Sequence, residues 1–320
     1  MWILSKTNYT LLKYKFLYIF FISQIIYSQQ FRNITSISDL NEISGNNGVA
    51  VADYDQDGDL DIFIVSEDGN ENISRLLQNT NNGNFVDVTE NSGINQNLNH
   101  EIDLINYDDN GEFSFDTIEH GDRLSASWGD FNNDGYPDLF LGNAVQSELY
   151  KNNGNGTFSN ITESAGFEIS CEKCYIAGAL WLDYDLDGYL DIFLSDYNQI
   201  SPNKLYRNLG DETFQQIDLT DYIENSNSFS AIPIYANDDM YPDIYIANDF
   251  DQFNQLLINL EGQGFVEMAV EYGVEDPFDG MGLTTCDFNN DLSLDFFVTN
   301  IKENSLYTKD TSNSSFAYTN

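Results

Sequence analysis

The nine residues Asp53-Tyr-Asp-Gln-Asp-Gly-Asp-Leu-Asp61 (loop 1) indicate the architecture of this chain, because closely similar nine-residue segments recur along it. Two further intact copies are Asp130-Phe-Asn-Asn-Asp-Gly-Tyr-Pro-Asp138 (loop 2) and Asp183-Tyr-Asp-Leu-Asp-Gly-Tyr-Leu-Asp191 (loop 3). Two eroded copies cover residues 235–243 (loop 4) and 287–295 (loop 5). Intact copies place oxygen-bearing side chains at positions 1, 3, 5 and 9, a glycine for a sharp turn at position 6, and an available carbonyl at position 7. A hard cation such as Ca²⁺ requires such ligands, so the sequence predicts calcium-binding loops.

The loops are not EF-hands, because that motif needs flanking helices and a bidentate glutamate at its twelfth position. Counted from the start of each intact loop, the twelfth residue is Ile64, Leu141 and Leu194. The run Leu60-Asp-Ile-Phe-Ile-Val65 and its counterparts after the other loops have the length and pattern of strands. The loops are therefore expected to join β-strands.

The spacing of the loops indicates a repeated unit of about fifty residues. Loops 2 to 5 begin 52 or 53 residues apart, whereas loops 1 and 2 begin 77 residues apart. The unit around loop 3 places one strand before the loop (179–183), one after it (191–194), a third at 204–208 and a fourth from Phe214. Four strands in such a unit are typical of a propeller blade. The sequence thus predicts an all-β fold, a β-propeller of four-stranded blades with five blades visible.

The domain organisation follows from the same repeat. One propeller is expected over residues 29–320, with blades 1 to 5 at about 46–94, 123–167, 175–222, 228–274 and 279–320. The surplus of the first period, at about 95–122, contains His100 and His120 and is expected to form a long loop or an extra hairpin around Asp109-Asn-Gly111. Since the chain stops within its fifth unit, we expect a C-terminally incomplete propeller, part of a seven-bladed ring; a closed five-bladed ring is the alternative.

Residues 1–28 have the pattern of a secretory signal peptide. Lys6, Lys13 and Lys15 precede an apolar run from Phe16 that is short for a membrane span, with a cleavage position near Ser28. The mature chain is therefore expected outside the cytoplasm, secreted or at the cell surface. An uncleaved anchor is the alternative.

The charge of the chain excludes two classes of partner. It holds 53 acidic residues against 12 lysines and arginines, a formal charge of −41. Such a surface repels nucleic acid and anionic lipid, so neither nucleic acid nor, after signal cleavage, a membrane is expected as a partner. Carboxylates crowded in the loops also repel one another, so removal of calcium is expected to loosen the blades.

The three cysteines have different expectations. Cys171-Glu-Lys-Cys174 is compatible with a local disulfide, a redox pair or half a zinc site, and a structural bridge is favoured because no second pair completes a metal cluster. Cys286 lies in a strand and is expected to be a buried small apolar residue.

At these residues the chain resembles the FG-GAP/VCBS repeat family, the calcium-loop β-propellers of integrin α-subunit heads and of many secreted bacterial proteins. Trp128-Gly-Asp130, the Asp-Gly-Tyr-x-Asp of loops 2 and 3, Leu149-Tyr-Lys-Asn152 and Gly156-Thr-Phe158 most resemble the branch of cartilage acidic protein and the ASPIC/UnbV proteins. The resemblance covers about residues 31–320, although the C-terminal ASPIC/UnbV segment is not visible. It implies a fold that usually closes with seven blades and holds Ca²⁺ in its Asp-rich loops.

The expected metal ligands are five residues in each intact loop and four in loop 5: Asp53, Asp55, Asp57, Asp59, Asp61; Asp130, Asn132, Asp134, Tyr136, Asp138; Asp183, Asp185, Asp187, Tyr189, Asp191; Asp287, Asn289, Asp291 and Asp295. In loop 4, Tyr235 replaces the first carboxylate and Met240 the glycine, so weak or absent binding is expected there. In loop 5, Leu292 replaces the glycine while the acids persist, so metal binding is left open.

The function expected from these features is that of a secreted, non-enzymatic calcium-binding scaffold for cell adhesion or for binding an extracellular protein or glycan. The alternative is a polysaccharide-acting lyase or hydrolase on a propeller; an assembly factor for another exported protein is a third possibility. Few side chains are available as bases or anion clamps, since the chain has two histidines and no Gly-x-Ser-x-Gly motif. Its 20 tyrosines and 23 phenylalanines stand mostly at repeated strand positions, which favours core packing over sugar stacking.

Overall fold

The computed structural model of the chain divides into two units, residues 1–41 and 42–320. It describes Asn33 and residues 46–66, 74–80, 83–94, 102–107, 113–118, 123–143, 147–167, 174–199, 201–237, 239–310 and 315–319. The predicted signal peptide, both histidines and Cys171 lie outside these described residues. Within them, no helix has the length and apolar character needed to cross a membrane.

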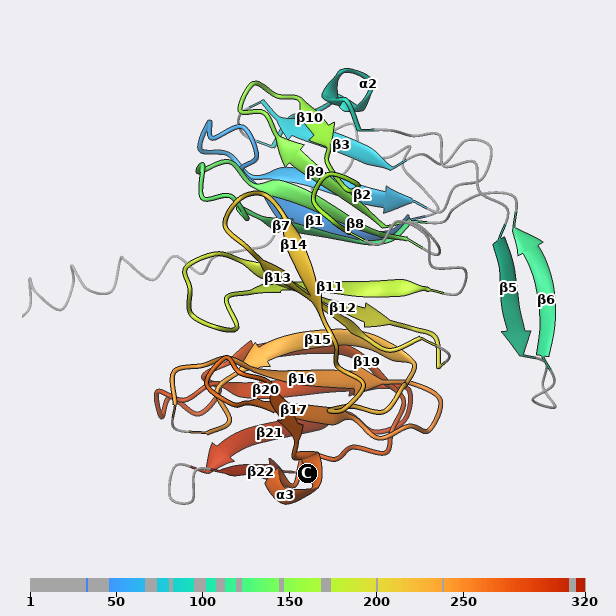
Figure 1. The fold of residues 1–320 in the computed structure, drawn as a ribbon, viewed down its shortest axis with the longest axis vertical. Coiled ribbons are helices and arrows are strands. Elements are labelled where there is room, and N and C mark those ends of the chain that lie inside the picture. Colours follow the sequence, from blue (N-terminus) through green and yellow to red (C-terminus); the bar gives the residue numbers. More distant parts are fainter. Residues whose placement is uncertain are drawn as a thin grey trace, which may run out of the picture. The chain divides into compact units, whose positions relative to one another are not determined.

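Five antiparallel sheets of four strands each make up the second unit (Figure 1). Blade 1 contains β1 (Asn46–Ala52), β2 (Asp61–Ser66), β3 (Arg75–Asn79) and β4 (Phe85–Asp87); blade 2 contains β7 (Arg123–Gly129), β8 (Asp138–Asn143), β9 (Glu148–Asn152) and β10 (Phe158–Asn160). Blade 3 contains β11 (Ile176–Leu182), β12 (Asp191–Asp196), β13 (Lys204–Asn208) and β14 (Phe214–Ile217); blade 4 contains β15 (Ser228–Ile234), β16 (Asp243–Asn248), β17 (Gln255–Asn259) and β18 (Phe265–Glu267). Blade 5 contains β19 (Gly280–Cys286), β20 (Asp295–Asn300), β21 (Ser305–Asp310) and β22 (Ser315–Thr319). The predicted all-β propeller of four-stranded blades is confirmed.

The remaining described elements are short. Within residues 95–122, β5 (Ile102–Tyr107) and β6 (Phe113–Ile118) pair as an antiparallel hairpin. Two four-residue helices, α2 (Thr89–Ser92) and α3 (Ala269–Tyr272), follow the outer strands of blades 1 and 4. Each is followed by a glycine in the left-handed conformation, which ends the helix at once.

Each Asp-rich loop joins the first two strands of its blade. In blade 1, Ala52 pairs with Asp61, so the nine residues 53–61 start directly after β1 and their last residue begins β2. The other four blades repeat this register. In loop 1 the turn needs positive φ angles at Gln56 (60°) and Gly58 (95°), which explains the glycine at position 6.

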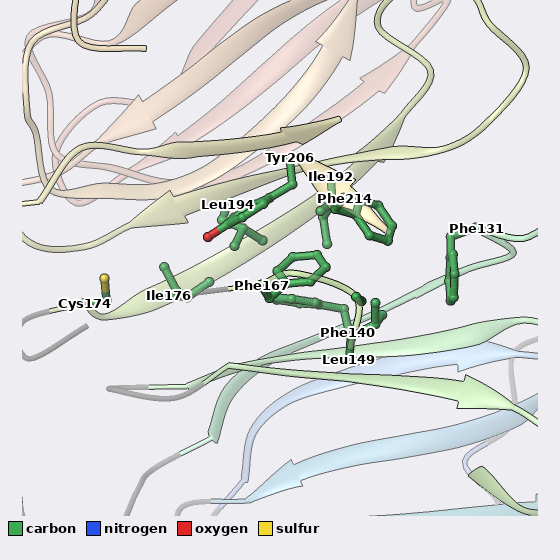
Figure 2. Close-up of a cluster of buried hydrophobic side chains, with 11 residues drawn as sticks. Phe131, Phe140, Leu149, Phe167, Cys174, Ile176, Ile192, Leu194, Tyr206 and Phe214 are labelled. Atoms are coloured by element: carbon green, nitrogen blue, oxygen red, sulfur yellow. The ribbon is translucent and has the colours of Figure 1, made fainter. Parts of the chain in front are cut away.

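The blades pack through apolar side chains from repeated strand positions. One core cluster, shown in Figure 2, joins Phe140 and Leu149 of blade 2 to Ile192, Tyr206 and Phe214 of blade 3. The aromatic residue at one repeated position of the second strand is fully buried in four blades: Phe63, Phe140, Phe193 and Tyr245. These rings serve the core, as expected from their periodic recurrence.

Extensive contacts between described elements join consecutive blades only, so blades 1 and 5 each keep one face without a neighbouring blade. The missing neighbour exposes the aromatic side chain at the second loop position, since Tyr54 is 2% exposed in blade 1 whereas Phe288 is 60% exposed in blade 5. On the opposite end face, Val51 of β1 is 52% exposed.

The uncovered face of blade 5 also overturns the expectation for Cys286, which is a free, exposed cysteine. Its counterparts at the end of the first strand, Leu182 and Ile234, are buried. Leu182 packs into a cluster with Ile244 and Leu257 of the following blade, and no described blade follows blade 5. The prediction that Cys286 is buried was therefore wrong, because no described blade packs on this face of blade 5. The assignment of Cys286 to a strand was right.

Candidate metal centres

The carboxylate at position 1 organises the turn of each loop. In loop 1, Asp53 accepts hydrogen bonds from the backbone N–H groups of Asp57 (3.0 Å) and Gly58 (3.0 Å). Asp130, Asp183 and Asp287 accept the equivalent pair in loops 2, 3 and 5. Loop 4 has Tyr235 at this position and lacks the side chain for these bonds. The first carboxylate thus fixes the backbone around which the other oxygen ligands stand.

The carboxylate at position 5 continues the same pattern. Its Oδ1 accepts the N–H of position 7, at 2.9 Å for Asp57 in loop 1 and 2.9 Å for Asp134 in loop 2. Asp187, Asp239 and Asp291 do the same in the remaining loops. Position 5 is therefore held in one geometry in all five loops, including the two eroded ones.

The carboxylate at position 9 is buried and ties the loop to the third strand of its own blade. Asp138 accepts the N–H of Phe131 at 3.2 Å and the N–H of Asn152 at 2.8 Å. Burial raises the pKa of Asp138 to about 7, although the two backbone N–H groups oppose the shift. The same cause raises the pKa of Asp191 to about 7, and those of Asp61 and Asp243 to about 6. A cation beside such a carboxyl would favour its ionised form.

Two loops bring three predicted ligands together closely enough for one ion. In loop 1, carboxylate oxygens of Asp53, Asp55 and Asp61 lie within 4.8 Å of one another. In loop 3, those of Asp183, Asp185 and Asp187 do the same. The oxygens of Asp57, Asp59 and Asp191 are outside these two groups. In loops 2 and 5, position 3 is an asparagine, and its amide donates to the carboxylate at position 5 at 3.0 Å in both loops.

The donors of loop 3 fit a hard divalent cation. All of its candidate side-chain ligands are carboxylates, the ligand type that Ca²⁺ prefers. Oδ1 of Asp185 is buried and makes no hydrogen bond to any described residue. Burial, followed by the nearby charge of Asp187, raises the pKa of Asp185. A buried carboxylate oxygen without a donor is unfavourable unless a cation satisfies it, and the protein cation at Asp185, Nε of Arg207, lies beside the other oxygen, Oδ2, at 2.6 Å.

The two eroded loops differ from each other. In loop 4, the ammonium of Lys309 from blade 5 donates to the carbonyls of Tyr235 (2.9 Å) and Asn237 (3.3 Å), which places a protein cation at this loop. In loop 5, the backbone keeps the shape of the intact loops, because Leu292 adopts the positive φ (70°) that glycine supplies elsewhere. Loop 5 therefore retains the carboxylate framework despite the substitution.

The asparagine that ends the third strand links neighbouring blades, a role that sequence inspection did not identify. Nδ2 of Asn208 donates to the carbonyls of Leu190 in its own loop (3.0 Å) and Phe131 in the preceding loop (2.8 Å), and its Oδ1 accepts the N–H of Gly210 (2.9 Å). Asn152 and Asn259 repeat this set in blades 2 and 4. The recurring Leu-Tyr-x-Asn pattern was the available signal, but its partner lies a blade away.

A polar cavity of about 660 Å³ lies at blade 4, away from the Asp-rich loops. Its walls include the aromatic rings of Tyr222 and Phe253 and five carboxylates, with no lysine or arginine among the lining residues: Asp221, Glu224, Asp251, Glu267 and Glu275. Its floor is a hydrogen-bonded set of buried side chains, in which Asn248 Oδ1 accepts from Ser226 at 3.0 Å. Cavities with aromatic walls and convergent polar groups are common ligand sites.

The cysteine pair is partly visible. Cys174 is disulfide-bonded, which agrees with the favoured structural bridge, and its expected partner Cys171 lies outside the described residues. Cys174 is buried beside Ser201, with 3.5 Å between Sγ and Oγ.

Comparison with known proteins agrees with this geometry. A family model described as FG-GAP-like repeat matches residues 130–172, which contain loop 2 and the outer strands of blade 2. Cartilage acidic protein 1 of Xenopus tropicalis is 27% identical over 181 residues, covering 55% of this chain and 24% of that protein. The match thus spans about a quarter of the relative's length.

Among solved structures, a lectin of Agrocybe aegerita that recognises non-reducing terminal N-acetylglucosamine superposes with a TM-score of 0.50 at 15% identity, covering 86% of this chain and 66% of the lectin. At this identity the likeness concerns the fold alone. The resemblance to FG-GAP repeat propellers and to cartilage acidic protein, expected from the loop motifs, is confirmed by these matches.

Proposed function

We propose that this chain is a calcium-binding β-propeller that acts outside the cytoplasm as a non-enzymatic scaffold for an extracellular protein or glycan. The observation that carries the proposal is the repetition of one carboxylate framework in loops 1, 2, 3 and 5, each at the same join between the first two strands. Two of these loops gather three carboxylates within 4.8 Å.

The residues of the intact loops would hold the ion. Position 1 sets the turn, positions 3 and 5 supply further oxygens beside it, and position 9 connects the site to the third strand. When bound, Ca²⁺ supplies the positive charge that these crowded carboxylates lack. In loop 2, Asp130, Asn132, Asp134 and Asp138 would take these four positions.

Two observations support a binding rather than a catalytic role. The matches to an FG-GAP-like repeat and to cartilage acidic protein 1 favour a propeller scaffold, although the match covers about a quarter of that relative. The cavity at blade 4, with its aromatic and acidic walls, offers a surface for a ligand.

The calcium part of the proposal is tested by elemental analysis and calorimetric titration of the purified chain after EDTA treatment and dialysis. We expect several Ca²⁺ ions per chain and a higher melting temperature with Ca²⁺ than without it. Asp55→Ala, which removes the ligand oxygen at position 3, should reduce the uptake by one ion, whereas the surface control Glu163→Gln should leave it unchanged. Folded wild-type protein that binds no calcium would refute this part.

The ligand part is tested by screening glycan arrays and extracellular matrix proteins with and without EDTA. Binding that disappears with EDTA supports a calcium-dependent scaffold. Turnover of a polysaccharide in the same screen, detected as new reducing ends or unsaturated products, would instead establish the alternative enzymatic function.

A further inference from the structure

The residue just before the blade-linking asparagine differs in charge between the three intact loops. It is Gln78 in blade 1, Lys151 in blade 2 and Arg207 in blade 3. The following residue in each blade donates its backbone N–H to the position-9 carboxylate, so the three positions are structurally equivalent. Their side chains can therefore be compared directly with respect to the Asp-rich loop beside them.

In blade 3 the side chain is a cation that lies on the predicted metal ligands. Nε of Arg207 lies 2.6 Å from Oδ2 of Asp185, and Nη2 lies 3.2 Å from Oδ2 of Asp187. Both carboxylates belong to the group of three within 4.8 Å in loop 3. The guanidinium thus supplies positive charge to the two ligands that an incoming ion would need.

In blades 1 and 2 the equivalent side chain does not do this. Gln78 donates a hydrogen bond to Asp55, but the amide is neutral and adds no charge to loop 1. Lys151 is charged, yet it pairs with Glu212 of blade 3 rather than with an acid of loop 2. Among the three intact loops, loop 3 is therefore the one whose described contacts include a protein cation on its ligands.

We propose that Arg207 is a built-in competitor for calcium and lowers the calcium affinity of loop 3. This inference rests on the proposed calcium binding. An arginine stays charged at all physiological pH values, so the competition cannot be relieved by deprotonation. Calcium must either displace the guanidinium from Asp185 and Asp187 or bind beside it, and both outcomes cost affinity.

The expected size of the effect is modest because Arg207 is partly exposed and its ion pairs are screened by water. Replacing it by the glutamine that blade 1 uses, Arg207→Gln, should tighten calcium binding at one site roughly tenfold, the ratio to which about 1.4 kcal/mol corresponds. The same change should lower the melting temperature of the calcium-free protein slightly, because the acids of loop 3 lose their counter-charge.

The test is a reciprocal exchange measured by calorimetric calcium titration and by melting temperature against calcium concentration. Arg207→Gln should tighten calcium binding at one site relative to wild type, while Gln78→Arg should weaken it at one site. Lys151→Gln is the matched control, since Lys151 makes its ion pair elsewhere, and it should change neither titration. Loops 4 and 5 are the same in all four proteins, so differences between the titrations report on the exchanged positions.

The outcomes separate this inference from the proposed function. If the wild-type chain takes up no calcium, the proposed function fails and the competition with it. If the chain takes up calcium but Arg207→Gln leaves every affinity within twofold of wild type, the competition alone is overturned. A lower melting temperature without calcium, together with a larger rise on adding calcium in Arg207→Gln, would support it, because the guanidinium stabilises the ion-free loop that calcium has to displace.

Discussion

Replacing Asn208 by alanine should weaken the fold much more than the loss of one polar side chain at a sheet edge. The side chain is buried between blades 2 and 3 and makes three hydrogen bonds, two as donor and one as acceptor. Alanine leaves the carbonyls of Phe131 and Leu190 and the N–H of Gly210 without their partner. Asn208 and Phe131 are fully buried, so water cannot replace the lost partner at the carbonyl of Phe131.

The magnitude follows from these three bonds. A hydrogen bond contributes about 1 kcal/mol net, and a buried group left without a partner costs about 1–3 kcal/mol. We therefore expect Asn208→Ala to lower the free energy of unfolding by about 3 kcal/mol, which at roughly 2 °C per kcal/mol for a chain of this size lowers the melting temperature by about 6 °C.

Asn79 provides the matched control, because it ends the third strand of blade 1, where no described blade precedes. Its side chain makes one hydrogen bond as donor, to Leu60 at 3.2 Å, and its Oδ1 accepts none. Asn79→Ala should therefore cost about 1 kcal/mol. Differential scanning calorimetry of both variants and wild type, in the same calcium concentration, measures the difference. Equal destabilisation by the two substitutions would refute the blade-linking role.

Three further outcomes are expected. Burial raises the pKa of Asp196 to about 6, above its usual 3.8, so this carboxyl stabilises the fold at low pH and the contribution is lost as the pH rises through 6. Asp196→Asn should remove up to roughly 3 kcal/mol of this pH dependence of stability, measured by melting curves from pH 4 to 8. An unchanged pH dependence in the variant would contradict this prediction. Gly142→Ala brings a Cβ within 2.6 Å of the carbonyl oxygen of Ile176 in the next blade. It should lower the free energy of unfolding by about 1–3 kcal/mol, measured by urea denaturation. A variant as stable as wild type would show that the two blades can move apart at no cost. Leu292→Gly should stabilise loop 5 by about 1 kcal/mol, because Leu292 holds φ at 70° while 95% exposed; a lower unfolding midpoint would argue that the leucine makes a compensating contact.

The repeat made much of the fold predictable from the sequence. In each blade, apolar periodicity predicts the strands, and a glycine or an acid that accepts turn N–H groups predicts the turn. Both signals depend on residues that are close in sequence. Asp53 and Gly58, for example, lie five residues apart and meet through one hydrogen bond. The strand order, the loop positions and the burial of the periodic aromatic rings followed from such local patterns.

The neighbours across a blade boundary were not predictable in the same way. Asn208 finds its partner Phe131 77 residues earlier, and Cys286 is exposed because no described blade covers its strand. Arg207 looks like an ordinary strand residue until the sheet places it over Asp185.

The repeating unit and the oxygen-bearing residues of each loop can be read from the amino-acid order, because a β-hairpin and its turn are fixed by residues within one period. Which cation, carbonyl or apolar face each unit contacts depends on the packing of the blades. Hydrophobic packing between separate sheets is not directional enough to be read from the pattern of a single strand.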